Sequence, residues 1–344
     1  MPKFTRRTLL AGAMVPLAAA ARGNSVKFGV DLFSIRSSGY DAFQNLDYCA
    51  RFKAQVVHFS EIRFIGNLEK AHLEKVRAYA EKLGIEIELG MRSICPSSTL
   101  FDPKQGTAEE QITRMLESAK IVGSKIVRAF LGSMADRNTS IPMEGHIENA
   151  IKVLRNVRSR TLDSGLKIAI ENHAGDMQAR ELKSLIEGAG KDFVGACIDS
   201  GNPLWAIEDP HLTLETLAPY VLTSHVRDSA VWRTPEGTAV QWVRMGEGNV
   251  GIRDWVKKYA ELCPGKAMSL ETIVTGARNY NYLQPKFWDA YRKTPAWEFA
   301  RYLAIAEKGT ARPNPAPVPK EKQAEKERED LEASIRYARE ILGE

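Results

Sequence analysis

Four short apolar runs in the second half of the chain each finish on a residue that can bind a metal. The runs end at Glu171 (Lys-Ile-Ala-Ile-Glu), Asp199 (Val-Gly-Ala-Cys-Ile-Asp), His225 (Val-Leu-Thr-Ser-His) and Glu271 (Ala-Met-Ser-Leu-Glu). Each run has the continuous apolar character of a buried parallel strand. Three carboxylates and one imidazole suit a hard or borderline divalent cation such as Mn²⁺, Mg²⁺, Co²⁺ or Zn²⁺. The four residues are therefore predicted metal ligands, provided that the strand ends converge.

Proton transfer next to a carbonyl is the chemistry that such a site supports. A divalent cation would chelate a substrate carbonyl and the adjacent hydroxyl, and it would stabilise the enediolate formed when the neighbouring C–H is deprotonated. Glu171 and Glu271 are the candidate catalytic bases, one on each side of the metal. Return of the proton gives epimerisation or aldose–ketose isomerisation. Loss of a β-substituent instead gives dehydratase or lyase chemistry, and the residues do not separate these outcomes.

Polar residues beside the predicted ligands are candidates for binding the substrate. His173 points to the same side of an extended chain as Glu171. Asn202, in Asp-Ser-Gly-Asn, could bond a substrate hydroxyl. Arg227 could hold a substrate oxygen or pair with the adjacent Asp228.

A stretch after the third predicted ligand carries residues suited to a lid over a polar ligand. Trp232, Trp242 and Arg244 precede Gly-Glu-Gly at 246–248, and we expect this stretch to be a long loop. His58, which ends an apolar run near the start of the chain, is a further candidate for substrate contact. Other residues near strand ends that could line the pocket are Phe33, Arg36, Glu61, Arg63 and Arg92.

Strand and helix patterns alternate along the chain, and this alternation predicts an α/β protein with a (β/α)8 TIM barrel. Strands are expected to start near residues 27, 55, 85, 125, 167, 193, 221 and 267. Helices are expected at about 41–52, 68–83, 107–122, 147–163, 180–188, 211–218, 252–262 and 295–308. An open doubly wound sheet is the alternative, but no GxGxxG or Walker loop follows any strand. In a barrel, the ends of strands five to eight meet at one face.

The two ends of the chain differ in composition from the middle. Arg6-Arg7 before an Ala-rich run resembles a twin-arginine export signal over residues 1–22, which predicts a periplasmic protein and leaves the cytoplasm as the alternative. The barrel is expected at 23–310. Residues 311–344 contain a proline-rich linker and a charged helix, predicted as a C-terminal helical extension that packs on its own barrel or on a second subunit in a homo-oligomer.

Charge and cysteine content bound the possible partners of this 344-residue chain. The net charge is +5, and removal of residues 1–21 with Lys3, Arg6 and Arg7 lowers it to +2, too little to argue for nucleic acid as a partner. No membrane association is expected after removal of the signal. The four cysteines are widely spaced without a CxxC pair, so we expect buried free thiols.

The motifs together resemble the xylose isomerase-like TIM-barrel superfamily, in its sugar phosphate isomerase/epimerase group. The resemblance covers roughly residues 26–308. It rests on Glu-Asn-His at 171–173, Asp-Ser-Gly-Asn at 199–202, His-Val-Arg-Asp at 225–228, Gly-Glu-Gly at 246–248 and Glu271. It implies one divalent metal, often manganese, bound by Glu171, Asp199, His225 and Glu271. It also implies that the two glutamates move the proton, as in the group's ketose 3-epimerases.

The chain departs from the family pattern at one position, and two other classes of protein are alternatives. The family often has a substrate-binding histidine three residues after the aspartate, where this chain has Asn202, so the sugar stays open. A DNA-repair endonuclease of the related barrel type would need more than six histidines and a basic surface. A non-catalytic sugar-binding barrel would have no need for both Glu171 and Glu271.

Overall fold

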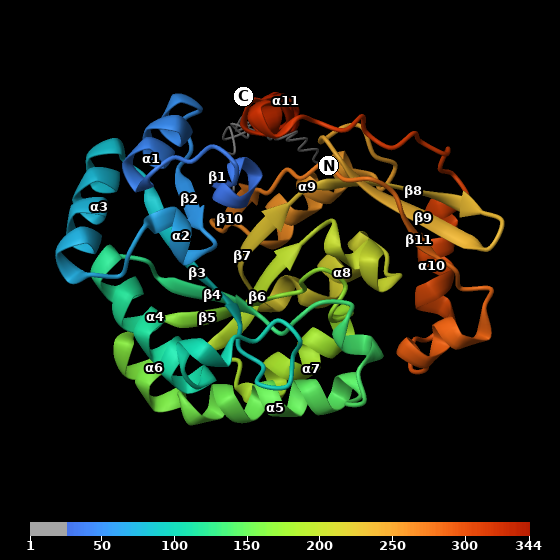
Figure 1. Ribbon diagram of the computed structural model, residues 1–344, viewed down its shortest axis with the longest axis horizontal. Helices are drawn as coiled ribbons and strands as arrows, with labels where there is room; N and C mark the ends of the chain where they lie inside the picture. Colours follow the sequence, from blue (N-terminus) through green and yellow to red (C-terminus); the bar gives the residue numbers. More distant parts are fainter. Residues whose placement is uncertain (1–25) are drawn as a thin grey trace, which may run out of the picture.

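Eight parallel strands close into a barrel in the computed structural model, which describes residues 26–344 (Figure 1). The predicted export signal at 1–22 lies outside the described residues. The barrel order is β1-β10-β7-β6-β5-β4-β3-β2. The strands are β1 Lys27–Asp31, β2 Val56–Phe59, β3 Glu86–Ser93, β4 Ile126–Phe130, β5 Lys167–Glu171, β6 Val194–Asp199, β7 Val221–Val226 and β10 Ala267–Leu270. The predicted (β/α)8 barrel is confirmed, with every strand within a few residues of its expected start.

Amphipathic helices follow the strands and cover the outside of the barrel (Figure 1). They are α1 Ala42–Arg51, α2 Ile62–Ile65, α3 Lys70–Leu83, α4 Ala108–Val122, α5 Met143–Asn156, α6 Arg158–Ser164, α7 Ala179–Ala189, α8 Pro210–Leu217 and α9 Ile252–Leu262. Thr107 and Glu110 form a capping box at the start of α4. Gly84, Gly123 and Gly165 end their helices in the left-handed conformation, as helix C-caps should. The helix expected at 147–163 is two consecutive helices, α5 and α6.

The stretch expected as a long lid loop is instead a β-hairpin. β8 Asp228–Thr234 pairs antiparallel with β9 Gly237–Val243, and β11 Arg278–Tyr280 adds a third strand beside β9. Helix α10, Ala296–Ala306, packs against β8. In Figure 1 this small sheet and α10 stand together beside the barrel mouth. The hairpin forms because two β-branched and aromatic runs flank a short Pro-Glu turn.

The C-terminal helix α11, Gln323–Leu342, completes the outer ring of helices. It packs against α9, β10 and the short helix η1 (Leu32–Ile35), so it lies between the last and the first helices of the barrel (Figure 1). Its apolar face is buried through Leu331, Ile335 and Ala338. Helix α10 follows β10, the eighth barrel strand, but it packs on the hairpin. Helix α11 therefore occupies the position in the outer ring between α9 and α1.

Two further properties of the described part of the chain concern its environment. Cys49, Cys95, Cys197 and Cys263 are all buried and unpaired, as expected. Among residues 26–344, none of the helices has both the length and the apolar character that crossing a membrane requires.

Candidate functional site

The four predicted metal ligands meet at the mouth of the barrel. Glu171 ends β5 and Asp199 ends β6, while His225 is the last residue but one of β7 and Glu271 directly follows β10. One ligand atom from each lies within 4.8 Å of the other three. All four side chains are buried. The parallel barrel brings them together because it places these strand ends on one face.

His225 is held with its Nδ1 atom towards the carboxylates. Nδ1 lies 3.2 Å from Glu171 Oε2 and 3.2 Å from Glu271 Oε2, and it has no hydrogen-bond partner. On the other side of the ring, Nε2 lies 3.0 Å from His58 Nδ1 and 3.3 Å from Asp31 Oδ2. The second nitrogen is thus occupied by supporting groups, which is the usual arrangement for a histidine that binds a metal.

His58 does not line the cavity as the sequence predicted. It is fully buried inside the barrel, where its ring packs edge-on against His225 at 4.7 Å between centroids. His58 Nδ1 also lies 3.4 Å from Glu88 Oε2, and Thr223 Oγ1 donates to the same carboxylate oxygen at 2.6 Å. His58 directly precedes Phe59, the last residue of β2, and its side chain points into the barrel interior. His58 therefore supports a predicted ligand and does not face the substrate.

Two arginines contact the carboxylates of the site. Arg128 Nε, from the middle of β4, donates to Glu171 Oε2 at 2.6 Å. Arg227 Nη2 lies 2.7 Å from Asp199 Oδ2 and also pairs with Glu271 Oε2. Burial would raise the pKa of Glu171, but Arg128 and His225 outweigh this effect and hold the pKa well below its usual range. Glu171 is consequently ionised at neutral pH.

The residues present fit a divalent cation. His225 Nδ1 is buried without a hydrogen-bond partner, and it is chemically suited to ligation, as is the Asp199 carboxylate beside it. The other Asp199 oxygen, Oδ1, accepts backbone N–H groups from Gly201 at 2.7 Å and Asn202 at 2.6 Å, which fixes the carboxylate. Asn202 Nδ2 donates to Glu171 Oε1 at 3.1 Å. Glu171, Asp199, His225 and Glu271 would hold the cation, which would supply a Lewis acid at this end of the cavity.

His173 presents one ring nitrogen to the cavity as a hydrogen-bond acceptor. Its Nδ1 lies 2.6 Å from the Gly132 carbonyl oxygen, which can only accept, so Nδ1 carries the proton. The ring stacks on Phe130 with 3.9 Å between centroids. Burial, the largest influence, lowers the pKa of His173 to about 4. The imidazole is therefore neutral at neutral pH, and Nε2 is unprotonated.

The cavity above the ligands has a volume of about 300 Å³. Three predicted substrate contacts line it, namely His173, Asn202 and Arg227, together with the predicted ligand Glu271. Its aromatic and apolar lining is contributed by Phe33, Leu100, Phe130, Trp205, Trp242 and Ile273. A cavity of this size, apolar in outline with a few convergent polar groups, suits a small organic ligand.

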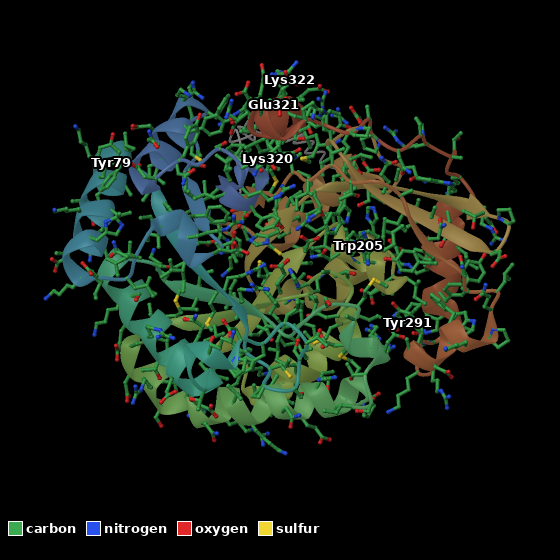
Figure 2. The ribbon with its side chains drawn as sticks, viewed as in Figure 1. Tyr79, Trp205, Tyr291, Lys320, Glu321 and Lys322 are labelled. Carbon is green, nitrogen blue, oxygen red and sulfur yellow. The ribbon has the colours of Figure 1, made fainter. Side chains whose placement is uncertain are left out.

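One wall of the cavity is a stack of two indoles between two arginines. Trp205 and Trp242 lie 3.9 Å apart and nearly parallel, at 8°. The Arg227 guanidinium is 4.4 Å from the Trp242 ring, and that of Arg278 is 4.1 Å from the Trp205 ring. Figure 2 shows Trp205 beside the barrel centre, with Tyr291 further out towards α10. The stack fixes Arg227 in place through cation–π contacts.

The structure does not bring Trp232 and Arg244 to the cavity. Trp232 packs with Ala239 and Val243 in the small hydrophobic cluster of the hairpin, since the strand register turns it away from the mouth. Arg244 Nε pairs with Asp330 of α11 at 2.5 Å. Both belong to the structure that surrounds the site.

Sequence reasoning missed several residues that the structure places in the site, among them Arg128, Phe130 and Trp205. Arg128 could have been found, because a charged residue inside the apolar run Ile-Val-Arg-Ala-Phe needs a buried partner. Trp205 lies in a 3₁₀ helix, Asn202–Ala206, after β6, and no periodic pattern marks its position.

Comparison with known proteins gives one family match and two curated relatives. A family model described as xylose isomerase-like TIM barrel matches residues 34–290. The chain is 26% identical over 196 residues to 3-oxo-isoapionate decarboxylase of Pectobacterium atrosepticum, which is 57% of this chain and 58% of that protein. It is 28% identical over 114 residues, 32% of this chain and 35% of that protein, to the uncharacterized YihM of Escherichia coli. The matches thus span less than two thirds of either relative's length.

Solved structures with the same architecture are distant in sequence. D-psicose 3-epimerase from Clostridium cellulolyticum H10 has a TM-score of 0.58 at 14% identity, covering 82% of this chain and 96% of its own. The IolI protein with a bound zinc atom has a TM-score of 0.57 at 16% identity, covering 81% and 96%. The 3-keto-D-glucoside 4-epimerase from E. coli has a TM-score of 0.55 at 13% identity, covering 81% of this chain and 98% of its own. At these identities the similarity shows the shared fold.

Proposed function

The chain belongs to the xylose isomerase-like TIM-barrel family, and we propose that it is a divalent-metal-dependent isomerase or epimerase of a sugar or keto-sugar. The observation that carries this proposal is the convergence of Glu171, Asp199, His225 and Glu271 at the barrel mouth. His225 Nδ1 faces two of these carboxylates and has no hydrogen-bond partner. The preferred metal in our proposal is Mn²⁺, with Mg²⁺, Co²⁺ and Zn²⁺ as alternatives.

The residues at the predicted ligand set would have different roles in the reaction. A bound divalent cation supplies the Lewis acid that makes a hydrogen next to the substrate carbonyl acidic. Glu171 Oε2 and Glu271 Oε2 each lie 3.2 Å from His225 Nδ1, and one glutamate removes the proton while the other returns it. Arg128 keeps Glu171 in the ionised form that a base requires.

The rest of the cavity would hold the sugar. His173 Nε2 accepts a hydrogen bond from a sugar hydroxyl, and Asn202 Oδ1, buried without a partner, accepts another. The indoles of Trp205 and Trp242 and the ring of Phe130 exclude water from the reacting carbon. Arg227 contributes two unused N–H groups for sugar oxygens.

Lyase chemistry on a keto-sugar is the second candidate, and it begins with the same proton abstraction. It is favoured by the relative named 3-oxo-isoapionate decarboxylase and by the two guanidinium groups beside the carboxylates. A sugar-binding barrel without catalysis is the remaining alternative. We also propose export through the twin-arginine pattern at Arg6-Arg7, and neither membrane nor nucleic acid as a partner.

Metal content and hydrogen exchange together test the proposal. Mass spectrometry of the purified protein should find about one divalent metal per chain, lost in His225→Ala. Keto-sugars incubated in deuterium oxide should exchange the hydrogen next to the carbonyl, as followed by proton NMR. Glu271→Gln should reduce the exchange rate about 10²- to 10⁴-fold and change sugar affinity modestly.

Glu261→Gln, an exposed position on α9, is the matched control and should leave exchange unchanged. A wild-type protein that stays folded, holds no metal and cannot be loaded with one would contradict the metalloenzyme proposal. Full exchange in Glu271→Gln would remove that glutamate from the catalytic step.

A further inference from the structure

A second cavity adjoins the metal-ligand cavity at the mouth of the barrel. It has a volume of about 360 Å³ and is lined by residues that follow β2, by the end of β3 and by the start of α4. Glu61 and Arg92 line both cavities, so the two spaces meet at these side chains. A ligand whose reacting end lies at Glu271 can therefore extend past Arg92 into the second cavity.

Arg92 stands out among the arginines of the two cavities because it makes no hydrogen bond or ion pair within the described part of the chain. Each of the others has a partner. Arg63 pairs with Glu61, Arg114 Nη2 donates to the Gln105 carbonyl at 2.7 Å, Arg128 pairs with Glu171, and Arg227 with Asp199. Arg92 is exposed at the junction, and its guanidinium is free to bind a ligand.

Arg227 supplies a second, independent observation. Its side chain is 2% exposed, and its Nε and Nη1 atoms have no hydrogen-bond partner. A buried N–H group without a partner costs free energy, and the cost is higher when the group is charged. These donors lie in the wall of the first cavity, where oxygens of a ligand would satisfy them.

We propose that the substrate is an anionic sugar whose carboxylate or phosphate group binds Arg92 at the junction of the two cavities. The inference rests on the proposed function, since the reacting end of that sugar is placed at the metal-ligand cluster and Arg227. A guanidinium can donate two parallel hydrogen bonds to either anion. Arg92 is then a residue that determines specificity for the charged end of the substrate.

Calorimetric titration of the Mn²⁺-loaded protein with matched sugar pairs tests this proposal. D-galacturonate is compared with D-galactose, and D-glucose 6-phosphate with D-glucose. One anion should bind about 10- to 100-fold more tightly than its neutral partner, and the pair that shows the preference identifies the anion as carboxylate or phosphate. Arg92→Gln should abolish the preference, while Arg92→Lys should retain part of it.

Arg77→Gln is the control, because Arg77 pairs with Glu81 at 2.8 Å on α3, away from both cavities. Equal affinity for anionic and neutral sugars, absence of binding by either, or an unchanged preference in Arg92→Gln would overturn the proposal. Hydrogen exchange on the same sugars separates this result from the proposed function. Exchange without an anion preference removes only the Arg92 subsite, and anion binding without exchange keeps the subsite but removes the isomerase.

Discussion

The imidazoles of His58 and His225 contact each other inside the barrel, with 3.0 Å between His58 Nδ1 and His225 Nε2. Glu88 lies beside this contact, with its Oε2 3.4 Å from the same Nδ1 atom. These contacts orient His225 so that its other nitrogen, Nδ1, faces Glu171 and Glu271. The support comes from β2 and β3, far in sequence from the four predicted ligands.

Removal of this support should weaken metal binding while all four ligands remain. We expect His58→Asn to raise the dissociation constant for Mn²⁺ about 10- to 100-fold, because the orientation of His225 is no longer fixed. Competition with a fluorescent chelator measures this constant. His211→Asn is the control, since His211 Nε2 bonds the Val250 carbonyl at 2.9 Å, away from the site. An unchanged constant in His58→Asn would show that the barrel alone orients His225.

Loss of Arg128 should destabilise the metal-free protein. Glu171 is fully buried, and Arg128→Met leaves its charge without the guanidinium partner. We expect the free energy of unfolding to fall by about 3 to 5 kcal/mol, measured by urea titration in the presence of a chelator. The double variant Arg128→Met/Glu171→Gln should recover much of the loss, because it removes the unpaired charge. A double variant no more stable than Arg128→Met would contradict this explanation.

Glu208 should make stability depend on pH. Burial raises the pKa of Glu208 to about 8 from 4.5, although Thr213 Oγ1 and the Ala179 N–H group donate to it. The folded state thus holds the proton more tightly than the unfolded chain. The stability that this group contributes is full below pH 4.5 and is lost as the pH rises through about 8.

The substitution Glu208→Gln imitates the neutral carboxyl group at every pH. Its unfolding free energy relative to wild type should therefore increase with pH, by up to about 5 kcal/mol. Urea titrations near pH 5 and near pH 9 measure this difference, with Glu261→Gln as the control. The same difference at both pH values would show that Glu208 does not titrate in this range.

Helix α11 should contribute to the stability of the barrel itself. Leu331 is fully buried between this helix and the barrel, so Leu331→Ala should lower the free energy of unfolding by about 2 to 5 kcal/mol. Leu262→Ala makes the same change at a position that is 46% exposed on the neighbouring α9, and its effect should be small. A single urea transition that shifts for Leu331→Ala is expected. A separate early transition would mean that α11 unfolds independently.

Much of this architecture could be predicted from the sequence because its signals are local. Each barrel strand is a short apolar run, and each helix before Gly84, Gly123 or Gly165 ends where its cap predicts. The four predicted ligands could be singled out because a charged or imidazole side chain at the end of such a run requires a partner. The barrel then determines that these ends meet.

The remaining parts depend on contacts between distant segments. The 228–243 hairpin has a strand pattern and a turn, but its proximity to the ligands suggested a lid. His58 lies near the end of its strand, as the predicted ligands do, yet its position in the register points it beneath His225. Arg244 was expected to lie over the substrate. It pairs instead with Asp330 of α11, and no local sequence pattern shows that α11 packs at this place.

The position of α11 has a consequence for the order in which the protein is made. The gap in the ring between α9 and α1 is filled by residues 323–342, which a ribosome adds after the whole barrel sheet. Until those residues emerge, the outer surface of β10 and the turn that carries Phe33 lack their cover. We therefore expect α11 to pack on η1 and β10 only after the barrel strands have been synthesised, so their apolar surface stays uncovered until then.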